Sequence, residues 1–168
     1  MRLAERKILY MANNSQQFKM WHAVAFAVIL VFAIGNKLYS SIWSKTTIIL
    51  AGKELRVLVA DTPRHRFQGW SGKKDMGKYD GMIFTFQDAS RHPMVMRDMY
   101  FPLDIIWLNG EKIVDIAPNL SPQAGVPEDR LLVYQARTTS TMVLEVPAGF
   151  MNETGVKIGD TVQIVDKN

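Results

Sequence analysis

An uncharged apolar run near the N-terminus constrains this chain more than any other feature. Residues 20–34, MWHAVAFAVILVFAI, contain no Asp, Glu, Lys or Arg. Extended to residue 41, the segment approaches the roughly 20 residues that a helix needs to cross about 30 Å of hydrocarbon. The run has no polar face, which argues against a helix buried in a soluble core. Residues 20–41 are therefore predicted to be a transmembrane signal anchor that attaches the chain to a membrane.

A cleaved signal peptide is the alternative that the same segment leaves open. Its apolar core is short, as in that class of targeting segment, and Ala33-Ile34-Gly35 offers a small-x-small cleavage site. Trp21 and Trp43 lie near the two ends of the segment, where membrane interfaces favour aromatic residues. This placement is typical of a membrane-spanning helix, and of the two alternatives the retained anchor is favoured.

Charge is distributed unevenly along the chain. Residues 1–45 carry six basic and one acidic side chain, a net charge of +5, whereas residues 46–168 carry 14 basic and 15 acidic side chains, a net charge of −1. The positive-inside rule predicts that residues 1–19 are a basic cytoplasmic leader. Residues 46–168 are then an extracytoplasmic domain of a single-pass membrane protein, or a secreted domain if the segment is cleaved. A neutral domain lacks the concentrated positive face that nucleic acid binding needs, so no nucleic acid partner is expected.

The pattern after residue 45 changes to short β-branched and apolar segments separated by turn residues, which is typical of strands. Asn109-Gly110 is the strongest hairpin signal in the chain. The polar stretch 71–80 is expected to be an exposed loop, and the proline-rich stretch 117–129 a long one. The expected strands cover residues 46–51, 54–60, 81–86, 92–97, 103–108, 112–116, 131–135, 141–146, 156–158 and 161–165.

Two short helices are expected between these strands. Thr62-Pro63 provides an N-cap and a first-turn proline, and Gly69 closes that helix. Pro147 predicts the start of the second helix, which Gly155 ends. The domain is therefore predicted to be mostly β, a single antiparallel sandwich or partly open barrel with two short helices.

The sequence offers few recognised chemical motifs. Cysteine is absent, which excludes disulfides, thiolate zinc sites and thiol nucleophiles. No P-loop, G-x-G-x-x-G, H-E-x-x-H or G-x-S-x-G motif is present, and no cofactor is expected. His65 and His92 could join Asp88 or Asp98 around zinc, but ordinary surface histidines are favoured. Thioether binding of Cu(I) is one alternative for the methionines that cluster in sequence, and core packing is favoured for them: Met76, Met82, Met94, Met96 and Met99.

Charged residues embedded in residues 94–107, MVMRDMYFPLDIIW, are the strongest candidates for a polar site. Both faces of the strand beyond Pro102 are apolar, so Asp104 is expected to lie near the core and to need an arginine or a set of backbone N–H groups as its partner. Arg97 and Asp98 are adjacent, so on a strand they point to opposite faces. Each therefore needs a different partner.

Several segments together resemble the family called domain of unknown function 192. The resemblance covers residues 46–168 and rests on RFQG at 66–69, GMIFTF at 81–86, MVMRDMYFPLDIIWL at 94–108, LEVPAGF at 144–150 and GVKIGDTVQI at 155–164. It implies an all-β sandwich or barrel with short helices in a bacterial or archaeal protein, often behind a signal sequence. It brings no established activity.

The resemblance places the recurrent polar residues of that family at Arg66, Arg97, Asp98 and Asp104, with Gly69 and Gly81 as backbone positions. The chain departs from the family pattern at two places. Trp70-Ser71 replaces a usual Leu-Met pair, with the basic Lys73 two residues further on, and Arg97-Asp98 replaces a usual Lys-Asn pair.

The leading functional hypothesis is a membrane-tethered module that binds a ligand or an envelope partner. Arg66, Arg97, Asp98 and Asp104 would form its polar centre, and the loop at 117–130 would cover it. The enzyme alternative is a hydrolase or transferase that acts on an envelope component, with Asp98 or Asp104 as acid or base. A purely structural envelope protein is the third alternative.

Overall fold

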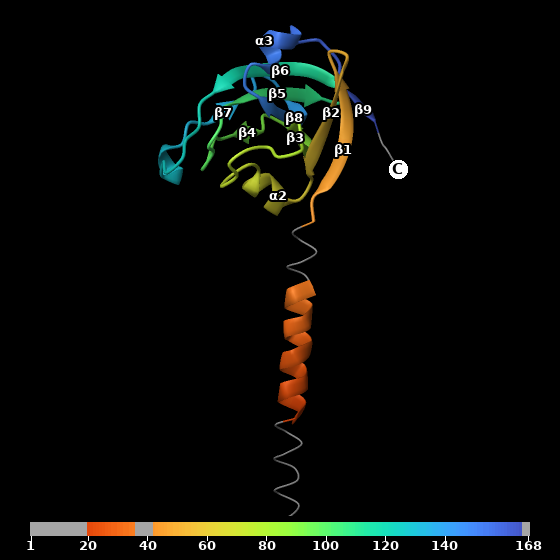
Figure 1. The fold of residues 1–168 in the computed structure, drawn as a ribbon, viewed down its shortest axis with the longest axis vertical. Coiled ribbons are helices and arrows are strands. Elements are labelled where there is room, and N and C mark those ends of the chain that lie inside the picture. Colours follow the sequence, from red (N-terminus) through yellow and green to blue (C-terminus); the bar gives the residue numbers. More distant parts are fainter. Residues whose placement is uncertain (1–19, 36–41, 166–168) are drawn as a thin grey trace, which may run out of the picture. The chain divides into compact units, whose positions relative to one another are not determined.

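The computed structural model describes residues 20–35 and 42–165, which divide into two units, one ending at residue 42 and the other beginning at residue 43. Residues 20–35, within the predicted anchor, form one α-helix (Figure 1). Over the described ranges, no helix combines the length and the hydropathy of a membrane span. The predicted leader at 1–19 and the rest of the predicted anchor at 36–41 lie outside the described residues, so the tether stays a prediction.

The second unit is mostly β, as predicted, and is built around one seven-stranded sheet that curls into half of a barrel (Figure 1). The partly open barrel is thus the closer of the two predicted architectures. The spatial order of the strands is β6-β5-β8-β3-β2-β1-β9. They are β1 (Ser44–Leu50), β2 (Lys53–Ala60), β3 (Gly81–Ser90), β5 (Leu103–Asn109), β6 (Lys112–Leu120), β8 (Ser140–Pro147) and β9 (Gln163–Val165). A separate two-stranded sheet pairs β4 (Pro93–Met94) with β7 (Tyr134–Gln135).

One pair of neighbouring strands departs from the predicted antiparallel arrangement. β2 and β3 run parallel, with Val57 opposite Gly81, whereas the other neighbours in this sheet are antiparallel. A parallel pair cannot be joined by a tight turn, because the chain must first return to the edge from which it started. Residues 61–80 make that return and contain α2 (Pro63–Gln68). The polar stretch before β3 is therefore part of a crossover connection.

Both faces of the central part of the sheet are buried, and alternate residues of β5 and β8 belong to two different cores. Leu144 and Val146 of β8 belong to one core, which also contains Phe150 and Met151 of α3 (Phe150–Thr154). Val143 of β8 belongs to the other core, together with Trp70. Most of the methionines that cluster in sequence are buried in this second core, as predicted: Met82, Met94, Met96 and Met99.

Both predicted helices form, although the second begins later than expected. The Thr62 hydroxyl caps α2 by accepting the His65 backbone N–H at 3.1 Å. Pro147 ends β8, and left-handed Gly149 precedes α3. In the predicted long loop, β6 continues to Leu120, and a single 3₁₀ turn, η1 (Glu128–Arg130), follows it.

The predicted hairpin at the C-terminus is wrong in one arm. β9 pairs with β1, while residues 156–158 form no strand. Val156 is buried in the core that contains α3, and the backbone N–H of Lys157 donates to the carboxylate of Asp160 at 3.0 Å. Gly159 has a positive φ of 96°, which places it in a turn. This turn, and not a strand, brings β9 to the edge of the sheet.

Candidate functional site

Asp104 is fully buried on β5 and has the kind of partner that its sequence context predicted. Its carboxylate accepts three backbone N–H groups, from Asn119 and Met151 at 2.9 Å each and from Gly149 at 3.3 Å. It shares a face of β5 with Ile106, which belongs to the core that contains α3. Asp104 therefore joins β5 to β6, to the turn between β8 and α3, and to α3 itself, and its oxygens are occupied by the backbone.

The predicted strand over residues 92–97 is reduced to the two residues of β4, because the chain turns after it. Asp98 has a φ of +48°, a left-handed conformation that interrupts the pleat of a strand. Its carbonyl accepts the backbone N–H of Gly72 at 3.0 Å, and its side chain is exposed. Arg97 and Asp98 thus do not lie on opposite faces of a strand.

Arg97 forms an ion pair with Glu128 of η1, in which two of its nitrogens donate to the two carboxylate oxygens. A further N–H donates to the carbonyl of Phe67 at 3.2 Å, and the guanidinium lies 4.2 Å from the centre of the Phe67 ring. The hydrogen bond with Glu128 raises the pKa of Arg97 and lowers the pKa of Glu128. Arg97 therefore fastens part of the predicted covering loop against α2.

Arg66 ties α2 to the sheet. Its Nη1 donates to the carbonyls of Asp61, at 2.8 Å, and Thr85, at 3.0 Å. The guanidinium also lies 5.4 Å from the centre of the Phe86 ring. Arg66 and Arg97 line one cavity, whereas Asp98 is not part of its lining and Asp104 faces the core on the opposite side of the sheet. The four predicted residues therefore do not form one polar centre.

His65 and His92 are buried, contrary to the expectation of ordinary surface residues. His65 stacks on Trp43 with ring centres 4.1 Å apart, and His92 stacks on Phe86 with ring centres 3.5 Å apart. Their apolar ring faces explain the burial. In the part of the chain that the structure describes, no three His, Asp or Glu side chains gather in a way that could hold a metal ion.

The cavity that Arg66 and Arg97 share has a volume of about 250 Å³ and lies between α2, the chain around β4, and the sheet. Most of its lining is aromatic or apolar, including Trp70, Phe84 and Met99. Glu145 of β8 is the acidic residue in this lining. It was missing from the candidates taken from the sequence.

Glu145 is a carboxyl in apolar surroundings. It lies opposite Met82 of β3 on one side and Ile105 of β5 on the other, and both of these belong to the core that contains Trp70. The residue is 4% exposed, and among the described residues its carboxyl has neither a hydrogen bond nor an ion pair. Burial raises the pKa of Glu145 to about 8. At neutral pH most molecules therefore carry this side chain in its protonated form.

A second residue of the lining, Trp70, also carries a polar group without a partner. The indole N–H of Trp70 is buried without a hydrogen-bond acceptor among the described residues, while the ring packs edge-on against Phe101. Gly69 directs Trp70 into this position, because its φ of 46° and ψ of −131° end α2 in a conformation that side chains disfavour. The lining residues of the cavity thus include one with a carboxyl and one with a buried N–H donor, and neither group has a partner among the described residues.

The signal that would have identified Glu145 is the one that identified Asp104. In TMVLEV, residues 141–146, a single charge is embedded in an apolar strand. Alternation places Glu145 on the face of Val143, which is buried. Such a residue must either find a partner or shift its pKa. Asp104 follows the first route, and Glu145 follows the second.

Gly81 is required at the edge of this site by a close backbone contact. A Cβ atom at this position would lie 2.5 Å from the carbonyl oxygen of Glu145. We expect Gly81→Ala to lower the free energy of unfolding by about 2–3 kcal/mol, because β3 and β8 would have to separate. Chemical denaturation of the full chain measures this change.

Gly52→Ala is the matched control for that variant. Gly52 has a φ of +76° in the turn between β1 and β2, and an added Cβ would meet nothing within 4 Å. The loss of unfolding free energy in Gly52→Ala is therefore limited to the strain of a side chain on a left-handed backbone, about 1 kcal/mol. Equal losses for the two variants would contradict the close contact at Gly81.

Comparison with protein families agrees with the resemblance carried by the sequence motifs. Residues 46–164 match the family model DUF192, described as uncharacterized ACR, COG1430. The chain belongs to this family. The match covers the curled sheet, both short helices and the cavity, so the site described above lies within the DUF192 domain. Among the curated proteins compared with it, none matches the chain.

Two solved structures share the fold. A proposed transcription regulator from Sinorhizobium meliloti 1021 is 27% identical, with a TM-score of 0.64 over 73% of this chain and 95% of that one. A protein of unknown function from Novosphingobium aromaticivorans DSM 12444 is 24% identical, with a TM-score of 0.60 over 72% of this chain and 84% of that one. The second likeness concerns the fold alone.

Proposed function

We propose that this DUF192 protein is a membrane-tethered extracytoplasmic module that binds a small polar ligand in the cavity beside Glu145. One observation supports the binding role above all others. Glu145 and Trp70 are buried residues that line the cavity, and neither the Glu145 carboxyl nor the Trp70 indole N–H has a hydrogen-bond partner among the described residues.

Such groups are expensive to bury. A polar group that leaves water without a new hydrogen bond costs about 1–3 kcal/mol. An isolated carboxyl in an apolar core is moreover easily replaced by leucine or methionine, which would fill the same space without this cost. Buried titratable groups with perturbed pKa values gather at functional sites for this reason.

The chemistry of the lining defines the ligand class. Trp70 supplies a donor, so the ligand needs an oxygen that accepts a hydrogen bond. Glu145 supplies a donor and an acceptor when protonated, and an anion when a cationic group displaces its proton. A volume of about 250 Å³ fits a small molecule. Hydroxyl-bearing molecules such as sugars and polyols, and small amines that also carry a carbonyl or hydroxyl oxygen, satisfy these requirements.

Support for the tether comes from the sequence. The uncharged run begins at residue 20, four basic residues precede it, and tryptophan lies near each end of the segment. Alkaline washing of cell membranes tests this part alone. An anchored chain stays with the membranes, whereas a peripheral or secreted form is released.

A thermal-unfolding screen of the full chain in neutral detergent tests the binding role. We expect at least one of the sugars, polyols, amino acids or hydroxyl-bearing amines to raise the melting temperature, since a ligand at about 100 times its Kd adds about 2.7 kcal/mol. Glu145→Leu keeps the volume of the side chain and Trp70→Phe removes the N–H, so each variant should lose the shift.

Glu153→Gln is the control, because it removes an exposed carboxylate of α3 that does not line the cavity. It should respond to the same compound as the wild type. A wild-type melting temperature that no compound changes would remove the support for binding. A shift that persists unchanged in Glu145→Leu would place the ligand elsewhere.

A carboxyl with a pKa of about 8 is also suited to general acid or base catalysis. In a hydrolase or transferase, Glu145 would take the role that the sequence suggested for Asp98 or Asp104. The hydroxyl in the lining, on Ser71, donates to the carbonyl of Arg97 at 2.8 Å and so does not serve as a nucleophile paired with Glu145. This arrangement favours binding over catalysis.

The description of the Sinorhizobium meliloti protein raises regulation of transcription as another role. Nucleic acid binding draws most of its affinity from a concentrated positive face. Residues 46–168 have a net charge of −1, which favours an envelope ligand over a nucleic acid for this chain.

A further inference from the structure

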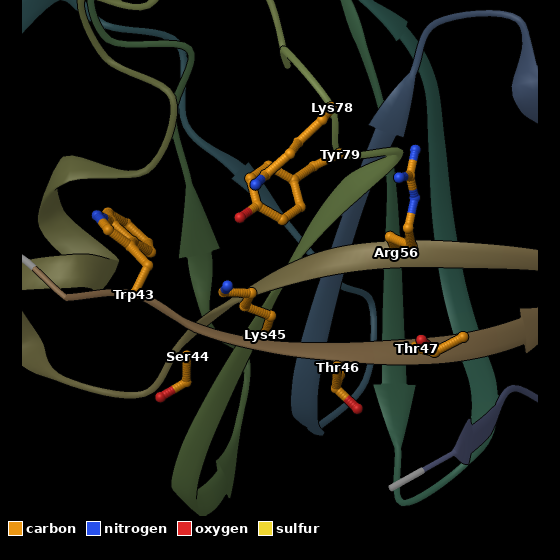
Figure 2. Close-up of a pocket in the computed structure, with 8 residues that line it drawn as sticks. All are labelled: Trp43, Ser44, Lys45, Thr46, Thr47, Arg56, Lys78 and Tyr79. Atoms are coloured by element: carbon orange, nitrogen blue, oxygen red, sulfur yellow. The ribbon is translucent and has the colours of Figure 1, made fainter. Parts of the chain in front are cut away.

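A second pocket, of about 550 Å³, lies against the outer strands β1 and β2 (Figure 2). It shares no lining residue with the cavity beside Glu145. Its lining combines three basic side chains, two aromatic rings and three serine or threonine residues, and contains no acidic residue: Trp43, Ser44, Lys45, Thr46, Thr47, Arg56, Lys78 and Tyr79.

The register of the two strands places basic groups on one face. Thr47 lies opposite Arg56, and Lys45 precedes Thr47 by two positions, so these three side chains point the same way. Lys78 reaches the pocket from the crossover segment. Figure 2 shows Trp43 at one end of this row and Arg56 at the other, with Lys45 and Tyr79 between them.

Positive charge in this pocket is only partly compensated. Arg56 pairs with Asp80 at 3.5 Å, whereas Lys45 and Lys78 form no ion pair with the described residues. The domain as a whole is close to neutral, with a net charge of −1 over residues 46–168. The local excess is therefore a property of this pocket, and like charges gathered in a concave site favour an anion.

The aromatic side chains give the pocket fixed walls. Trp43 stacks on buried His65 with ring centres 4.1 Å apart, and the Lys78 ammonium lies 5.7 Å from the centre of the Tyr79 ring. The backbone N–H of Tyr79 donates to the carbonyl of Met76 at 3.2 Å. Cations and hydroxyls suit a phosphate oxygen, and aromatic walls suit the organic part of a phosphate ester.

We propose that this pocket binds the phosphate of an anionic phospholipid headgroup. The assignment rests on the proposed tether, because Trp43 and Lys45 follow directly after the predicted span at 20–41. Tryptophan and lysine are the residues that membrane interfaces favour at such a position. Bound headgroups would hold the domain close to the bilayer from which its chain emerges.

The test measures binding of short-chain phosphatidylglycerol and short-chain phosphatidylcholine to the full chain in neutral detergent. The wild type should prefer phosphatidylglycerol, and Lys45→Gln/Lys78→Gln should weaken that binding by about 30-fold, since each lysine near an anionic lipid surface contributes about fivefold. Lys53→Gln/Lys157→Gln removes the same charge outside the pocket and should bind like the wild type.

Three outcomes would overturn the proposal. The first is equal affinity for both lipids, and the second is an equal loss of phosphatidylglycerol binding in the control variant. The third is binding of glycerol phosphate or a DNA duplex as tight as that of phosphatidylglycerol, because it would identify a soluble phosphate ester or a nucleic acid as the ligand. Lys45 and Lys78 are exposed, so the variants should keep the wild-type melting temperature. Failure of the tether itself is detected separately by alkaline washing, and failure of the Glu145 cavity by the thermal screen.

Discussion

Glu145→Gln is expected to stabilise the protein by about 2–4 kcal/mol at a pH of about 7.5. Burial raises the pKa of this carboxyl from 4.5 to about 8. Between these two values the folded state keeps a proton that the unfolded state releases, so stability falls as the pH rises through this window. The cost reaches at most about 5 kcal/mol above the folded-state pKa, at about 1.4 kcal/mol per pH unit. Glutamine has nearly the same shape and never ionises, so it removes this cost.

Chemical denaturation at several pH values from about 5 to about 8.5 measures the effect. The wild type should lose stability over this range, and the difference from Glu145→Gln should grow with pH. Glu153→Gln, at an exposed position of α3, is the control and should follow the wild type at every pH. A wild-type profile that rises toward pH 8 or parallels that of Glu145→Gln would show that Glu145 has a partner and an ordinary pKa.

A wild-type residue that lowers stability is itself informative. Proteins tolerate such residues chiefly where function needs them, because a stabilising replacement is otherwise easily found. Glu145 has apolar neighbours on both adjacent strands, where leucine would fit. The expected gain in stability from Glu145→Gln and the expected loss of ligand response in Glu145→Leu therefore both test whether Glu145 serves ligand binding. Together they separate a binding carboxyl from a structural one.

Local sequence patterns predicted most of the strands, because their signals lie within a few residues. The hairpin at Asn109-Gly110 and the helix that begins after Thr62 are of this kind. The parallel pairing of β2 with β3 could not be predicted in this way. It depends on how residues 61–80 cross the sheet and on contacts between segments distant in sequence.

The candidate site was predicted only in part for the same reason. Arg66 and Arg97 are 31 positions apart, and the cavity that they share exists because α2 packs beside the turn after β4. The free-energy cost of burying a charge led to the prediction that Asp104 has a partner, and this prediction is confirmed. The free-energy cost of burial could not show that Asp104 faces one core while Glu145 faces the other, since this depends on the register of both strands.

Asp104→Asn is expected to destabilise the protein by about 3 kcal/mol or more, opposite in sign to the change at Glu145. The Asp104 carboxylate accepts the N–H groups of Asn119 and Gly149 through Oδ1, and that of Met151 through Oδ2. An asparagine can present one oxygen, so its NH₂ group must face at least one of these donors. A buried hydrogen bond to a charged group contributes about 1.5–3 kcal/mol, and an unpaired buried donor adds its own cost. Urea denaturation of the full chain gives this change directly.

Asp88→Asn is the matched control, because Asp88 is an exposed carboxylate at the end of β3. It should change stability by less than about 0.5 kcal/mol. Folded Asp104→Asn should still respond to any compound that stabilises the wild type, since Asp104 lies on the face of the sheet opposite the cavity. A variant that kept full stability and lost only the ligand response would make Asp104 the functional carboxyl. The combination of lost stability and retained response would instead give Asp104 and Glu145 separate roles. Asp104 would hold α3 on the sheet, and Glu145 would hold the ligand.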